Sequence, residues 1–177
     1  MVSLYALFWI FVTIFAIIGA VRGWAKEVLV TFSSILAIFI IVLLTTYIPF
    51  MKPDSGMSAS TRFYIQLFVV SIMVIFGYLT PKVRGVLGDR LARQRFADIL
   101  LGLVIGALNG YLIIGTIWYY MDASNYPISF ITGPNPDTDV GQAAISLLNN
   151  MPPNYLVPPW IYFAVALAFI FVVVVFI

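Results

Sequence analysis

One uncharged segment, residues 98–121, most constrains how this chain can fold. It carries no charged residue after Asp98. As an α-helix rising about 1.5 Å per residue, it is long enough to cross a bilayer core of roughly 30 Å. Three of its glycines recur every four residues: Gly102, Gly106 and Gly110. A helix places them on one stripe, and Asp98 and Asn109 fall on the same stripe within an arc of about 120°.

This stripe indicates a helix that packs against other helices. Small residues allow helix backbones to approach closely in a membrane, and polar side chains there avoid lipid. We therefore predict that the 98–121 helix is central to the fold and that Gly102, Gly106, Gly110 and Asn109 form its packed face. Gly115 points about 140° away from the centre of the stripe, so a larger side chain is predicted to be milder there.

The overall composition indicates that the solvent of this chain is lipid. Apolar residues make up 63% and charged residues 9%, against about 25% charged residues in soluble domains. A soluble chain of 177 residues could not bury so much apolar surface. The net charge of +2 gives no reason to expect nucleic-acid binding.

The chain contains neither cysteine nor histidine. Thiol chemistry, the commonest general base and the commonest transition-metal ligand are therefore missing. No nucleophile–base pair or carboxylate cluster suggests a reaction. We predict a protein that is not an enzyme and that binds no cofactor and no metal.

Five apolar stretches are long enough to be transmembrane helices. They cover about residues 2–21, 28–48, 63–80, 98–121 and 160–177. No basic residue precedes the first stretch and Arg22 and Lys26 follow it, which is the reverse of a secretory signal. The sequence thus predicts a single all-α domain, residues 1–177, that is a polytopic membrane helix bundle with five spans.

The polar connections between these spans have different characters. Residues 22–27 form a tight turn, and 122–159 form a long, proline-rich segment. Within that segment, Asp139 and Gln142 have the spacing of a capping box before a brief interfacial helix. In the third span, Gln66 is interpreted as a bundle-facing packing residue, with a substrate contact as the alternative.

Basic residues after the third span predict a surface for lipid or a partner. The segment 81–96 has apolar residues spaced for one face of an amphipathic helix. Its arginines would bind anionic lipid or a partner protein, or else serve only to set the topology. They are Arg84, Arg90, Arg93 and Arg95.

The distribution of positive charge predicts the orientation. Seven of the nine Lys and Arg residues follow spans one and three, and two follow span two. Because basic connections stay in the cytoplasm, the N-terminus and the segment 122–159 are predicted to lie outside. The C-terminus is predicted to be cytoplasmic.

A charge cluster is predicted at the cytoplasmic end of the bundle. The first three of its members follow the first span: Arg22, Lys26 and Glu27. Asp98 begins the fourth span from the same side. We expect Asp98 to pair with Arg22 or Lys26, with Glu27 completing the cluster. A solvated Asp98 at the interface is the alternative.

Two motifs give the chain a resemblance to a known family. The residues 18–28, IGAVRGWAKEV, are similar to the first hairpin of the colicin V production protein (CvpA) family, which has a Gly, then Arg-Gly, an aromatic residue and a basic-Glu pair. Asp98 with the three glycines resembles that family's fourth span. The family commonly carries Arg or Lys where this chain has Asn109, and it usually has four spans.

The resemblance implies a multi-pass protein of the bacterial inner membrane, connected with colicin V production or export and with envelope maintenance. It implies no catalytic residues. Three functions remain open: a non-enzymatic scaffold or export-associated factor, an accessory subunit of a larger membrane complex, and a small transporter or channel. The expected partners are the lipid bilayer, anionic lipid, and a second copy or a larger membrane complex.

Overall fold

The computed structural model describes residues 3–52, 54–79 and 92–176, and within these ranges every element is a helix. The all-α prediction is therefore confirmed. The membrane-length helices are α1 (Leu4–Arg22), α2 (Trp24–Tyr47), α3 (Ala59–Tyr78) and α4 (Ala92–Ala123). The shorter ones are the 3-10 turn η1 (Pro49–Met51), α5 (Asp139–Leu148), α6 (Pro152–Tyr155) and α7 (Trp160–Phe176).

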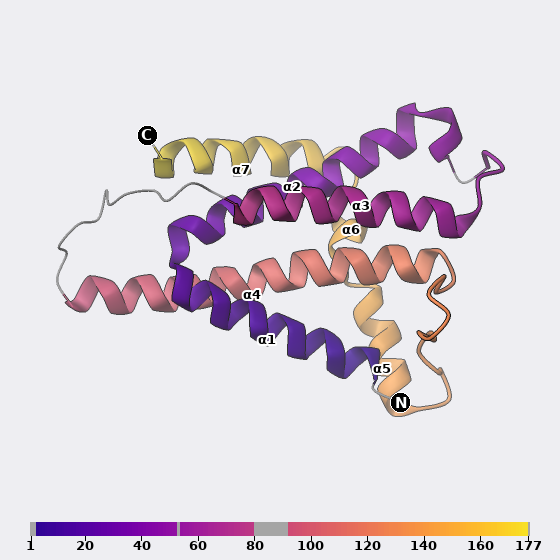
Figure 1. Cartoon of the computed structure of the whole chain (residues 1–177), viewed down its shortest axis with the longest axis horizontal. Helices are drawn as coiled ribbons and strands as arrows, with labels where there is room; N and C mark the ends of the chain where they lie inside the picture. The colour runs from indigo at the N-terminus through magenta and orange to yellow at the C-terminus, as the bar shows by residue number, and fades with distance from the viewer. Residues whose placement is uncertain (1–2, 53, 80–91, 177) are drawn as a thin grey trace.

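The longest helix, α4, is the centre of the bundle. It contacts α1, α2, α3, α5 and α6, with α1 along one side and α2 and α3 along the other (Figure 1). Helices α1 and α3 both pack on α4, and their backbones have little contact with each other. The expectation that the rest of the chain packs around this helix is confirmed for these elements.

Four helices are long and apolar enough to cross a membrane: α1, α2, α3 and the Arg95–Ala123 part of α4. The residues of the predicted fifth span form α7, which has 17 residues and a length of about 25 Å. It runs along α2, where Tyr162 meets Phe39 and Phe169 meets Phe32. The structure thus has four candidate spans and a shorter apolar helix, and a fifth crossing stays a prediction.

The turn between α1 and α2 is shorter than the sequence indicated. It consists of Gly23 alone, with a φ of 86° that side-chain-bearing residues rarely adopt. Helix α2 therefore begins at Trp24, and Lys26 and Glu27 lie in its first turns. Their assignment to a polar connection was wrong, because one glycine suffices to reverse the chain.

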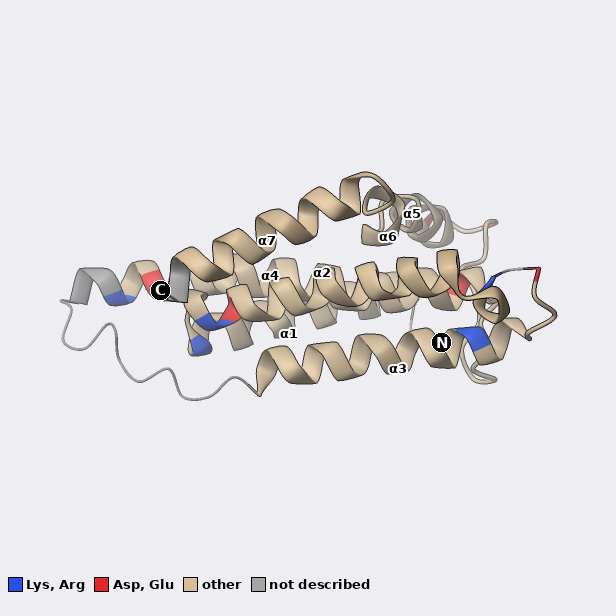
Figure 2. Cartoon of the chain, turned by 90° about the horizontal axis from the view of Figure 1, so that it is seen from above, with Lys and Arg blue, Asp and Glu red and all other residues tan. Residues whose placement is uncertain are grey.

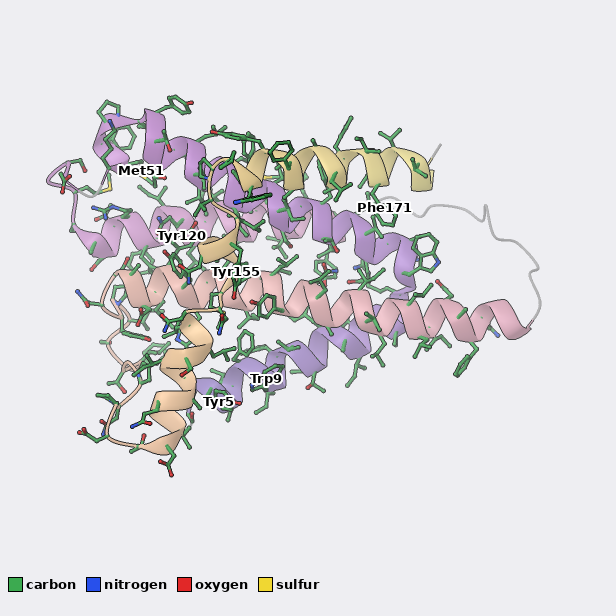
Figure 3. The ribbon with its side chains drawn as sticks, turned by 180° about the vertical axis from the view of Figure 1, so that it is seen from behind. Tyr5, Trp9, Met51, Tyr120, Tyr155 and Phe171 are labelled. Carbon is green, nitrogen blue, oxygen red and sulfur yellow. The ribbon has the colours of Figure 1, made fainter. Side chains whose placement is uncertain are left out.

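The segment 122–159 folds back onto the bundle. Helix α5 lies against α1 and α4, and helix α6 lies against α4 (Figure 3). Met151, Pro152 and Pro153 are buried. The predicted helix near 139–148 is present, but its N-cap is Thr138, whose hydroxyl accepts a hydrogen bond from the Gly141 N–H. The Asp139–Gln142 capping box was therefore placed one residue too late.

Candidate functional site: a buried polar cluster beside a glycine seam

The predicted glycines of α4 lie directly against α1. A Cβ on Gly102 would overlap the carbonyl oxygen of Gly19, and one on Gly106 would overlap that of Phe15. At Gly110 an added Cβ would come 2.9 Å from the Cα of Val12. We call this contact the glycine seam: Gly19 of α1 with Gly102, Gly106 and Gly110 of α4. The two helix backbones can come this close because glycine has no side chain.

Gly115, the predicted tolerant position, is also buried. A Cβ there would lie 2.8 Å from the Met151 sulfur and 2.9 Å from Pro152 Cδ. The folded-back segment 122–159 supplies this neighbour, which the helix periodicity of 98–121 alone does not reveal. Gly115 is therefore no lipid-facing control for the glycine seam.

On another face of α4, Asn109 binds the first turns of α2. Its Nδ2 donates to the Glu27 side-chain Oε2 at 2.8 Å and to the Glu27 main-chain oxygen at 3.0 Å. Its Oδ1 accepts a hydrogen bond of 2.6 Å from the Thr31 hydroxyl. Both ends of the amide are thus engaged by one helix, α2.

Arg22 completes the charge balance of Glu27. The Arg22 Nη1 lies 2.6 Å from Glu27 Oε1 in an ion pair across the Gly23 turn. The guanidinium also sits 4.3 Å from the centre of the Tyr78 ring and donates to the Tyr78 main-chain oxygen at 3.4 Å. Such a cation–π contact adds to the ion pair where water is excluded.

These contacts define the polar cluster: Arg22 of α1, Glu27 and Thr31 of α2, Tyr78 of α3 and Asn109 of α4. Glu27 and Asn109 are fully buried, and the Arg22 side chain is 20% exposed. Burying a carboxylate is costly unless it is paired and hydrogen-bonded, and here each Glu27 oxygen has a donor. The cluster therefore fixes the relative positions of four helices.

The charged and polar ends of the bundle leave a long uncharged middle. In Figure 2 the coloured residues of the described chain gather toward the two ends, with a wide uncoloured stretch between them. Glu27 stands at the edge of that stretch, on the first turns of α2. A carboxylate in this position requires the internal partners that Arg22 and Asn109 supply.

The four residues of the predicted charge cluster are only partly brought together. Among the described residues the ion pair is between Arg22 and Glu27, and Lys26 is half-buried on α2. Asp98 instead accepts a hydrogen bond of 3.2 Å from the Trp24 N–H. The expected partner of Asp98 was wrong because α2 begins at Trp24, which brings its free N–H groups to the carboxylate.

Asp98 also explains why Gly23 has no side chain. A Cβ on Gly23 would lie 2.8 Å and 3.0 Å from the two carboxylate oxygens of Asp98. The carboxylate thus occupies the space beside the turn and faces the positive end of the α2 dipole. Asp98 therefore belongs with the glycine seam and the turn, not with the Arg22 ion pair.

The predicted lipid or partner surface is mostly outside the described chain. Arg84 and Arg90 lie outside the described residues. Arg93 lies in the first turn of α4, where side chains are not described, and Arg95 is exposed on α4. This surface stays a prediction.

Sequence reasoning missed Thr31 and Tyr78 of the cluster and Gly19 of the seam. Thr31 follows Glu27 by four residues and so shares its helix face, a signal that was present. Gly19 precedes Gly23 by four residues, which has the same spacing as the glycines of α4. Tyr78 offers no comparable signal, because a tyrosine at the end of an apolar helix is ordinary at a membrane interface. Gln66, which the sequence indicated as a bundle-facing packing residue, is 5% exposed.

The chemistry of the cluster suits helix association. No group of three or more Asp, Glu, His or Cys side chains gathers within the described ranges. Glu27 already has a guanidinium and an amide as neighbours, so a cation would have to displace Arg22. The buried hydroxyl Oγ1 of Thr116, further along α4, has no hydrogen-bond partner and stands apart from these contacts.

The fold and the site define a class: an all-helical, multi-pass membrane protein whose central helix is held by a glycine seam on one face and a polar cluster on another. The family model described as Colicin V production protein matches residues 5–133. The chain therefore belongs to the Colicin V production protein family. The matched range contains α1 to α4, and α5 to α7 follow it. The comparisons with curated proteins and with solved structures found no match.

Proposed function

We propose that this protein is a non-enzymatic scaffold of the bacterial cytoplasmic membrane, associated with the export of colicin V or with envelope maintenance. The family supports the connection with colicin V production. The observation that carries the scaffold role is the closed polar cluster. Both Glu27 side-chain oxygens and both ends of the Asn109 amide are engaged within the protein.

A transporter site needs polar groups that exchange partners with a passing substrate. The polar cluster has its partners within the protein and ties α1, α2, α3 and α4 together, which supports a rigid platform. A platform acts through what it holds in place, such as a second copy or other membrane subunits. The accessory-subunit and transporter functions are the alternatives that the test below separates.

The function is tested in bacteria that produce colicin V and lack their own family member. Expression of this chain should restore release of active colicin V into the medium. The same cells, opened in mild detergent, should yield the protein as a homo-oligomer without other subunits, as checked by mass spectrometry. Stoichiometric foreign subunits would favour the accessory-subunit function. Transport of a substrate by the purified protein in liposomes would contradict the scaffold function and support the transporter.

The proposed orientation has the N-terminus outside and the C-terminus in the cytoplasm. It rests on the seven-to-two distribution of Lys and Arg. A single cysteine at Ser55 or Asn135 should react with a membrane-impermeant reagent in intact cells, and one at Gln94 should react only after lysis. Labelling of Gln94→Cys in intact cells would reverse the orientation.

A further inference from the structure

An apolar groove runs between α1 and α3 at the end of the bundle where α1 begins and α4 ends. Helix α4 forms its floor with Ile114 and Trp118, and Leu7 of α1 and Leu67 of α3 form its walls. Ile128 and Ile131, from the loop after α4, close the end of the groove. Its volume is about 250 Å³. The groove exists because α1 and α3 both pack on α4, while their side-chain contacts with each other involve Tyr78 at the far end of α3.

The groove offers no polar group to a ligand. All twelve lining residues are apolar or aromatic. The one polar atom among their side chains, the Trp118 indole nitrogen, donates to the Tyr126 hydroxyl at 3.3 Å, and that hydroxyl donates to Asp122 at 2.9 Å. Water needs two to four polar partners to occupy a cavity, so the groove is unsuited to water.

The rims of the groove consist of side chains that face the bilayer. Phe11 lines the groove from α1 and is 37% exposed, and its neighbour Ile14 is exposed as well. On the other rim, Tyr64 and Phe68 of α3 are exposed beside the lining residues Phe63 and Leu67. Both rims belong to helices apolar enough to span the membrane. The groove is thus continuous with the hydrocarbon around the protein.

We propose that this groove binds one acyl chain of a membrane phospholipid. The bilayer supplies this occupant directly, because both rims belong to helices apolar enough to span the membrane, and a partner helix docked in the groove would keep lipid away from Trp118. An apolar cavity of about 150 Å³ in another protein already takes up benzene, so this groove has room for a length of alkyl chain. Because Ile128 and Ile131 close the end, the lipid enters from the side. This inference does not depend on the proposed function.

The test uses Trp118 as a reporter inside the groove. The protein keeps Trp118 and carries Trp9→Phe, Trp24→Phe and Trp160→Phe. It is reconstituted in phosphatidylcholine vesicles with or without bromine atoms on the acyl chains. Trp118 is 3% exposed, so strong quenching of its fluorescence by the brominated lipid is expected only if a chain occupies the groove.

A matched pair of variants separates the groove from the general lipid surface. Leu7→Phe with Leu67→Phe fills the groove and should abolish most of the quenching. Leu100→Phe with Leu103→Phe adds the same groups to the exposed face of α4 and should leave it unchanged. Circular dichroism checks that both variants fold. Equal quenching in the two variants, or no quenching of Trp118 in the parent, would overturn the proposal.

A second measurement counts the lipid directly. Native mass spectrometry of the detergent-purified protein should show one phospholipid retained by the parent and by the Leu100/Leu103 variant. The groove-filled variant should lose that mass. If the double variant does not fold, Leu67→Phe alone fills part of the groove and should weaken both lipid retention and quenching. A folded Leu67→Phe protein that keeps the lipid and shows undiminished quenching would contradict the proposal.

Discussion

Helix α4 is held on two faces by different chemistry. Against α1 it presents Gly102, Gly106 and Gly110, and the contact is made by backbone atoms that approach one another. Against α2 it presents Asn109, and the contact is made by hydrogen bonds to Glu27 and Thr31. Lipid provides no hydrophobic force between helices, so close packing and polar bonds are the two available means of association.

The two faces of α4 are disrupted by opposite kinds of substitution. The glycine seam fails when a side chain is added, because no space exists for it. The polar cluster fails when a side chain is removed or made apolar, because a buried charge or donor loses its partner. Variants that add volume therefore test the glycine seam, and variants that remove a polar group test the polar cluster.

The largest effect is expected from Glu27→Leu in the polar cluster. It leaves Arg22 without its counter-ion and removes one of the two acceptors of the Asn109 Nδ2, the other being the Glu27 main-chain oxygen. Removing one member of a buried ion pair costs ~3–5 kcal/mol, and the lower end applies because the Arg22 side chain is 20% exposed. The measurement is the free energy of unfolding in detergent. Glu27→Gln keeps an acceptor for Arg22 and should lose less, and a Leu variant as stable as the parent would show that the pair is not stabilising.

The next effect is expected in the glycine seam. Gly106→Leu drives a side chain into the Phe15 carbonyl and the Gly19 backbone, and overpacking typically costs ~1–3 kcal/mol. Val104→Leu also adds volume to α4, but on a face where Val104 is 58% exposed. Thermal unfolding in the same detergent should separate the two variants. Equal stability of Gly106→Leu and Val104→Leu would mean that α1 does not stay on the seam.

A smaller effect tests the hydroxyl of the polar cluster. Thr31→Val keeps the shape of the side chain but removes the donor to Asn109 Oδ1, which should cost about 1 kcal/mol. Thr45→Val is the matched control, because the Thr45 hydroxyl bonds only to carbonyls of its own helix, those of Ile41 and Val42. Unfolding in denaturant measures the stability of both variants. If Thr45→Val loses as much stability as Thr31→Val, the bond between Thr31 and Asn109 makes no separate contribution.

The sequence predicted the glycine face of α4 better than its polar face. Gly102, Gly106 and Gly110 are on one element, so their relation follows from helix periodicity alone. The polar cluster joins residues from four helices, and its pairing depends on where α2 begins. Assigning 22–27 to a connection placed Glu27 outside the second span, in a charge cluster with Asp98, and the one-residue turn at Gly23 instead brings it to Asn109.

The region after α4 was the least predictable from the sequence. The polarity and prolines of 122–159 indicated an outer loop, and a short helix near 139–148 was found. Its return to bury Met151 and Pro152 against Gly115 depends on tertiary contacts without a local pattern. Helix α7 packs on α2, where Tyr162 meets Phe39, and with 17 residues it is shorter than the four candidate spans, so a fifth crossing stays a prediction.

The smallest effect decides to which face of α4 Asp98 belongs. Asp98 accepts the Trp24 N–H and lies beside Gly23, so Asp98→Asn should cost only the dipole interaction of a charge at a helix N-terminus, ~0.3–1 kcal/mol. Arg22→Gln breaks the separate ion pair with Glu27. Since the two residues share no bond in the described structure, their losses in a double-mutant cycle should add within about 0.3–0.5 kcal/mol. A coupling energy clearly above that range would instead mean that Asp98 and Arg22 interact directly, and would join the turn and the polar cluster into one site.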